Sequence, residues 1–190
     1  MIFPTMAPER TASSGVFLLK RYVEHGVAGL VRGGSDIGSG TLGIDFQDWL
    51  CTFDAANIYV TPQTSGASLT LAMLNVTQAT VAMDRSNQPN IAYIALGVCK
   101  LRWWDATSNS FATTVFSGAT RIFVVQDDPR DPMSSSSDVV VAYQGADTGV
   151  YFRRQRDRYS VEYTATAAPF GYLLQSFGMA VDNRLRWRCV

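Results

Sequence analysis

From residue 44 onward the chain carries short runs of β-branched, aromatic and other apolar residues, several of them alternating with polar ones. Each run is bounded by Gly, Pro, Asn, Asp or Ser, the residues that favour turns. The runs are 49–53, 58–60, 68–74, 79–83, 90–96, 98–104, 111–116, 121–126, 138–143, 149–154, 159–166, 172–180 and 184–190. About a dozen short strands at regular spacing predict an all-β domain, either a β-sandwich or a small propeller-like domain.

The segment before this region is less regular. Residues 1–15 predict an irregular arm. In residues 16–32 the apolar spacing fits a helix, but Gly26 and Gly29 would each cost about 1 kcal/mol inside one. Short strands around a turn fit residues 16–32 equally well.

Five glycines and two serines occupy residues 33–43 and predict a hinge or exposed loop, because glycine leaves the backbone free. We therefore divide the chain into an N-terminal arm with a Gly-rich hinge, residues 1–43, and an all-β propeller-like domain, residues 44–190.

A weak internal repeat favours the propeller. Tyr93 and Leu101 recur 50 residues later as Tyr143 and Tyr151, and the members of each pair are eight positions apart. Periods of about 40–50 residues with four strands each are typical of propeller blades. Two outer units with the same spacing start at residues 51 and 177.

Three segments carry a resemblance to a known group of proteins. They are DVVVAYQGADTGVYFRRQRDRYSVEY at 138–163, GMAVDNRLRWRCV at 178–190 and NQPNIAYIALGVCKLRWWD at 87–105. This pattern resembles propeller-like repeat domains of tailed-bacteriophage virion proteins, and it covers residues 78–190. The resemblance implies a structural protein of a phage particle, at the tail, its tip or its attachment hub. It carries over no functional residues.

Composition fits a protein of an assembly. Charged residues make up 17% of the chain, whereas typical soluble domains have roughly 25%. The formal net charge is +0, which gives no colloidal repulsion between copies and argues against nonspecific nucleic-acid binding. All basic residues except Lys20 and Lys100 are arginines, whose planar fork suits interfaces.

No cofactor, metal or catalytic residue is expected. Cys51, Cys99 and Cys189 lack the spacing of a zinc site, His25 is the only histidine, and we expect the cysteines to be buried and reduced. The chain has no phosphate loop, dinucleotide fingerprint or nucleophile elbow. It also has no apolar run of the ~18–20 residues that span a bilayer, so no membrane insertion is expected.

Four arginines form the densest charge cluster: Arg153, Arg154, Arg156 and Arg158. On a strand, Arg153 would lie on one face and the other three on the opposite face. The cluster predicts a subunit contact or a grip on an anionic glycan through bidentate arginine. The alternative is a solvated outer strand whose arginines pair with nearby carboxylates such as Asp157 and Glu162.

Trp103 and Trp104 are adjacent, so on a strand they face opposite ways. One is expected in the core, and the other at an interface or on the surface, where it could stack beside Arg102 on a sugar or a partner chain. The alternative is core packing in both directions.

A sialidase-like site is an alternative interpretation of the same segment. It would use Tyr159 or Tyr163 as the nucleophile, backed by Glu162. The chain is too short for six blades and has no Asp-box turn, so we expect no enzyme.

The expected function is therefore a structural component of a bacteriophage virion, tail-associated, which serves assembly or the attachment of other tail proteins or fibres. Its partners would be other virion proteins and copies of itself, and it would be assembled in the bacterial host cytoplasm. The alternative is a receptor-binding module for host surface glycan, and a glycoside hydrolase is a third, weaker interpretation.

Overall fold

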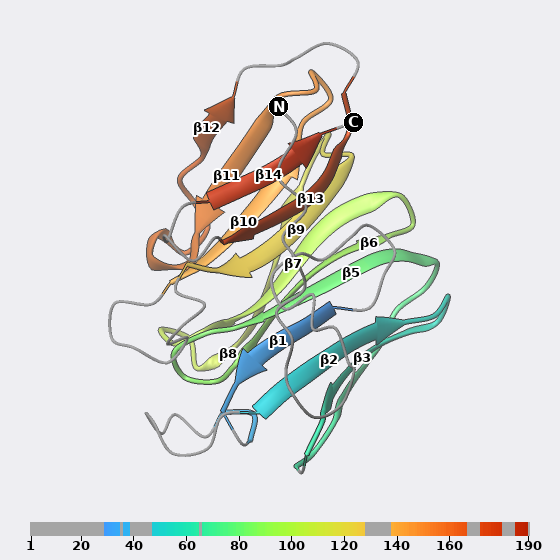
Figure 1. Cartoon of the computed structure of the whole chain (residues 1–190), viewed down its shortest axis with the longest axis vertical. Helices are drawn as coiled ribbons and strands as arrows, with labels where there is room; N and C mark the ends of the chain where they lie inside the picture. Colours follow the sequence, from blue (N-terminus) through green and yellow to red (C-terminus); the bar gives the residue numbers. More distant parts are fainter. Residues whose placement is uncertain are drawn as a thin grey trace, which may run out of the picture.

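Antiparallel sheets make up the described part of the protein. The computed structural model describes residues 29–34, 36–38, 47–64, 66–127, 138–166, 172–179 and 185–189. They form three four-stranded sheets, in each of which consecutive strands are neighbours, and one two-stranded sheet (Figure 1). The all-β prediction is confirmed.

The strands follow chain order through four sheets. Sheet A contains β1 (Gly29–Gly33), β2 (Gln47–Phe53), β3 (Asn57–Pro62) and β4 (Leu69–Ala72). Sheet B contains β5 (Val76–Met83), β6 (Pro89–Ala95), β7 (Val98–Asp105) and β8 (Ser110–Phe116). Sheet C contains β9 (Arg121–Gln126), β10 (Val139–Gln144), β11 (Val150–Arg154) and β12 (Tyr163–Thr166). Sheet D contains β13 (Leu174–Met179) and β14 (Leu185–Cys189).

Each sheet packs on the one before it through its first strand. β5 packs on β1 and β2, β9 packs on β5 and β6, and β13 packs on β9 and β10. In Figure 1 sheet A lies at the lower end of the long axis, sheet B in the middle and sheet C at the upper end, with β13 and β14 in front of sheet C. This is the order of propeller blades, although the described residues form no closed ring.

Three apolar clusters fill the spaces between successive sheets. Trp49 and Ile91 are fully buried between sheets A and B, and Leu101 and Ile122 are fully buried between sheets B and C. Phe123 contributes to the third cluster, between sheets C and D. Burial of such side chains contributes about 1.5–3 kcal/mol each, so the stacking of the sheets is the main source of stability.

Buried polar side chains link β5 to β9. The Gln78 amide donates a hydrogen bond to the carbonyl of Ile122, and the Val124 N–H donates to Thr80 Oγ1 at 3.1 Å. The Gln126 amide donates at 2.6 Å to the carbonyl of the last residue of β5. These bonds fix the position of sheet C along sheet B, because any slide would leave buried polar groups unpaired.

Buried amides also mark the other two junctions. At the junction of sheets C and D, Gln144 accepts a hydrogen bond from the Leu174 N–H at 3.1 Å and donates one to the Tyr172 carbonyl at 2.8 Å. Beside sheets A and B, Asn87 Oδ1 accepts from the Gly34 N–H at 2.8 Å. Every junction thus has an amide side chain that satisfies backbone groups of the adjoining segment.

The predicted boundary at residue 43 needs a correction. β1 lies inside the segment assigned to the arm and hinge, and it pairs with β2 along its whole length. A Cβ at Gly33 would lie 2.7 Å from Asn87 Oδ1, so this glycine serves close packing and not a hinge. Among the described residues the β structure therefore begins at β1, and the rest of the predicted arm, residues 1–28, lies outside them.

The internal repeat is confirmed for its inner pair. Tyr93 and Tyr143 lie on the second strands of sheets B and C, and Leu101 and Tyr151 lie on the third strands. The last outer unit is aligned wrongly. Its anchor Phe177 lies on β13, which packs on sheet C in the way that first strands pack on the preceding sheet.

Replacing Thr80 by Val tests the link between β5 and β9. Thr80→Val keeps the shape of the side chain but leaves the buried Val124 N–H without its acceptor. We expect the free energy of unfolding to fall by about 1–3 kcal/mol in urea denaturation. The control Thr70→Val, on an exposed position of β4, should change it by less than about 0.5 kcal/mol. Equal effects of the two changes would contradict the proposed role of Thr80.

Candidate functional site

The arginine-rich segment turns away from the sheet. β11 ends at Arg154, and Gln155–Asp157 form a short 3-10 helix. Arg158 and Tyr159 follow with left-handed backbone, at φ 52° and 55°. The predicted alternation of faces therefore holds only for Arg153 and Arg154, because the chain beyond them is a turn and not a strand.

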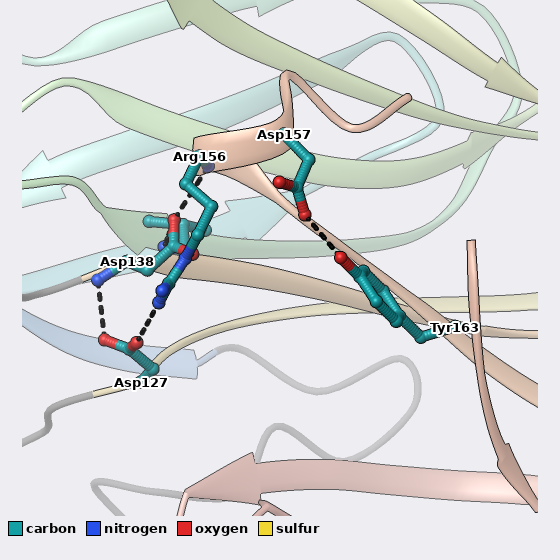
Figure 2. A network of polar contacts seen from close by, with 6 residues as sticks. Asp127, Asp138, Arg156, Asp157 and Tyr163 are labelled. Carbon is teal, nitrogen blue, oxygen red and sulfur yellow. Dashed lines mark hydrogen bonds and ion pairs between the residues drawn. The ribbon is translucent and has the colours of Figure 1, made fainter. Parts of the chain in front are cut away.

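Arg156 lies between two carboxylates from the β9–β10 connection. Its Nε lies 2.5 Å from Asp138 Oδ2, and a terminal nitrogen lies 3.4 Å from Asp127 Oδ2 (Figure 2). Asp157 was an expected partner of the arginines, but its carboxylate accepts a hydrogen bond from the Tyr163 hydroxyl at 3.0 Å. Arg156 is thus paired with acids of its own sheet.

Residues 155–159, named here the 155–159 turn, also join sheet C to sheet B. The Gln155 amide donates to Asp84 Oδ2 at 2.9 Å, and Arg158 forms an ion pair with Asp105. Both carboxylates are buried in sheet B, Asp84 directly after β5 and Asp105 at the end of β7. Arg158 is therefore occupied in holding two sheets together.

Tyr159 is the buried centre of this junction. Its hydroxyl donates to Asn90 Oδ1 at 2.9 Å, and its ring meets Trp103 edge to face at 5.2 Å. Burial raises the pKa of Tyr159 well above its ordinary value. Tyr159 therefore stabilises the junction as a neutral phenol.

Arg153 completes a second polar group. It forms an ion pair with Glu162 at 3.1 Å and donates to the Tyr143 hydroxyl at 3.2 Å, and Tyr143 in turn donates to Glu162. Burial, followed by the bond to Glu162, raises the pKa of Tyr143. The Arg153–Glu162 pair agrees with the alternative interpretation of the arginine cluster, in which the arginines pair with nearby carboxylates. Tyr143 was not named from the sequence, because it lies on a different strand.

Glu162 forms a hydrogen-bonded pair with neither of the two tyrosines of the sialidase-like interpretation. Tyr159 donates to Asn90 and Tyr163 donates to Asp157, so neither hydroxyl is hydrogen-bonded to Glu162. Tyr143 takes the place beside Glu162, but it is nearly buried.

The two tryptophans face opposite ways, as the alternation predicts. Trp103 is buried in the cluster between sheets B and C, whereas Trp104 is half-buried on the other face of β7. There its ring meets Phe111 edge to face at 5.1 Å, and Arg102 Cζ lies 4.7 Å from the Phe111 centroid. Together, Arg102, Trp104 and Phe111 form an aromatic–cationic surface on the outer strands of sheet B.

One end of sheet B carries exposed apolar side chains. They form what we call the turn patch: Leu74 (70% exposed), Leu96 (63%), Val115 (50%) and Val98 (38%). The Leu96 N–H donates to the Asn75 carbonyl, which places the two turns side by side. Exposed apolar side chains that gather at one end of a sheet indicate a candidate interaction site. No residue of the turn patch was named as a candidate from the sequence.

Leu96 is unfavourable for the free chain in two ways. It is exposed, and it lies in a two-residue hairpin loop with Gly97 in which both residues have positive φ, 53° and 73°. Such loops strongly prefer Asn-Gly, because Asn tolerates the left-handed region and Leu does not. A Leu-Gly pair between two strands is the signal by which the sequence could have shown this position.

Three further observations concern metal sites, membrane-spanning helices and the cysteines. Among the described residues, no three His, Cys, Asp or Glu side chains are placed to hold a metal ion. The described part also contains no helix long and apolar enough to cross a membrane. Cys51 and Cys99 are buried free thiols and Cys189 is half-buried, so the expected burial is confirmed for the first two.

Comparison with protein-family models, curated proteins and solved structures finds no significant match. The resemblance to phage virion proteins thus stays a prediction from the sequence segments themselves.

Asp84 provides a test of the 155–159 turn through pH. Burial raises the pKa of Asp84 against the hydrogen bonds from Gln155 and from the backbone of Gln88 and Ser86, which lower it. The folded chain therefore binds this proton more tightly than the unfolded chain does. The free energy of unfolding should fall as the pH rises from about 4, the ordinary pKa of Asp, through the raised pKa.

Asp84→Asn keeps an acceptor oxygen and removes this titration. We expect the variant to gain stability relative to the unmodified chain as the pH rises through that window, measured by urea denaturation at several pH values. A difference that does not change with pH would contradict the raised pKa of Asp84.

Proposed function

We propose that this chain is a non-enzymatic structural protein that assembles with copies of itself and with other proteins through the turn patch. The four arginines expected to make contacts are engaged within the chain, so they do not carry the proposal. The turn patch does.

Leu96 is the observation that carries this function. An exposed leucine in the left-handed region costs the free chain conformational energy and leaves apolar surface in water. A partner that covers the side chain would remove this apolar surface from water, and that gain would offset the conformational cost. Strain of this kind persists at interaction sites, where it serves binding.

We extend the proposal to a bacteriophage virion, at the tail, on the resemblance of residues 78–190 alone. The stacked sheets would supply a rigid platform, and the partners would be other virion proteins and copies of this chain.

A second candidate function is the binding of host surface glycan. The aromatic–cationic surface favours it, because a half-buried Trp104 beside Arg102 suits stacking on a sugar ring. Binding of the full chain on a glycan array should then be lost in Trp104→Ala. Binding that survives this change would place the glycan elsewhere, and no binding at all would dismiss the candidate.

Leu96→Asn separates assembly from folding. Asn suits the loop better than Leu, so the melting temperature of the variant should be equal or higher. Light scattering of the full chain should show oligomers for the unmodified protein and a shift toward the monomer mass for the variant.

The control Val161→Thr removes another exposed apolar side chain, 45% exposed and outside the turn patch, and should leave the mass unchanged. A full chain that is monomeric at all concentrations would contradict the proposed function. Unchanged assembly in Leu96→Asn would contradict the role of the turn patch.

A further inference from the structure

β8 forms the outer edge of sheet B. It pairs with β7 on one side, and among the described residues no strand pairs with its other side. The opposite edge of the sheet, β5, packs on sheets A and C. Every second residue of an edge strand points its N–H and C=O away from the sheet, so β8 offers these groups to a further strand.

β8 lacks the features by which proteins usually protect a sheet edge. Such edges are kept short, or they carry charged residues, proline or a bulge. The last strands of sheets A and C, β4 and β12, have four residues each, whereas β8 has seven. Its sequence SFATTVF contains no charged residue, Pro or Gly, and its register with β7 has no bulge. A long, regular and uncharged edge of this kind is suited to strand pairing.

The side chains of β8 make the strand complementary to itself. Ala112 packs on the cluster between sheets B and C, so Phe111, Thr113 and Val115 lie on the opposite, outer face. In an antiparallel pair with Thr113 of both copies at the two-fold axis, Phe111 of each copy would lie opposite Val115 of the other. Aromatic–β-branched and Thr–Thr pairs are favourable cross-strand neighbours, and this register pairs the whole strand. Self-complementarity favours a second copy as the partner.

The positive charges of β7 lie away from this contact. Lys100 is the neighbour of Val115 and Arg102 is the neighbour of Thr113, both on the side of β8 that faces its own sheet. In the paired sheet the two strands that carry Arg102 would be three strand spacings apart, about 14 Å. This separation exceeds the Debye length of about 8 Å at physiological salt, so repulsion between the copies is screened.

We propose that β8 pairs edge to edge with β8 of a second copy, antiparallel and with Thr113 opposite Thr113. The four-stranded B sheets of the two copies would then form one continuous sheet. Backbone hydrogen bonds would hold the copies together, and Phe111 of each copy would cover Val115 of the other. This inference rests on the proposed function, because Val115 belongs to the turn patch and a second copy is named as the partner that covers it.

Opposite charges at residue 113 test the pairing in the full chain. Thr113 is exposed, so Thr113→Lys and Thr113→Glu should each melt close to the temperature of the unmodified protein. Each variant alone would place like charges opposite each other at the two-fold axis. We expect its dissociation constant to rise at least about tenfold, measured by light scattering over a dilution series. An equimolar mixture should recover the dimer, because Lys would then lie opposite Glu.

Thr70→Lys and Thr70→Glu are the matched controls, because Thr70 is an exposed threonine on β4, the edge strand of sheet A. Neither should change the mass, alone or in a mixture. Weaker association of the Thr113 variants without recovery in their mixture would overturn the pairing at the two-fold axis.

Thiol cross-linking tests the same contact without introducing charge. In a Cys189→Ser background, Thr113→Cys should give a covalent dimer with a short bis-maleimide, because opposite side chains lie about 4.5–5.5 Å apart at Cβ. Thr70→Cys should give none. Cys51 and Cys99 should not react, because burial raises their pKa to about 12 and about 11.

Mass and cross-linking together separate this inference from the proposed function. An oligomer that neither cross-links at residue 113 nor responds to charge there would overturn only the pairing of β8. A chain that is monomeric at all concentrations would overturn both.

Discussion

Buried amide side chains determine how each sheet sits on the next. Apolar packing between sheets is non-directional, so it stabilises the stack without fixing its register. Gln78 and Gln126 add direction between β5 and β9, Asn87 does so beside sheets A and B, and Gln144 does so where β13 joins sheet C. The positions of the turns depend on these bonds, and so do the turn patch and the aromatic–cationic surface.

Much of the fold could be predicted from the sequence because strand alternation is a local property. The opposite orientations of Trp103 and Trp104 follow from that alternation alone. β1 lies where the sequence left a helix and short strands equally open, because its sequence GLVRG is bounded by glycines and the strand is defined by its pairing with β2. Long-range pairing of this kind leaves no local pattern.

The arginine-rich segment shows more clearly which features could not be predicted from the sequence. Its run of charges predicted a continuing strand, but Arg158 and Tyr159 adopt left-handed backbone. Neither is Gly or Asn, the residues that usually indicate this conformation in a sequence. Their partners Asp105 and Asn90 lie 53 and 69 residues away in the chain. Residues that looked available for a partner are therefore part of the sheet B–sheet C junction, and the surface that is available consists of apolar turn residues.

We propose that this stack of sheets assembles through the turn patch. Hydrogen–deuterium exchange of the full chain over a dilution series tests this claim most directly. Backbone amides around Leu96 and Leu74 should be more strongly protected at high concentration and should lose that protection together on dilution. Rapid exchange of these amides at every concentration would contradict the claim, as would protection that does not change with concentration.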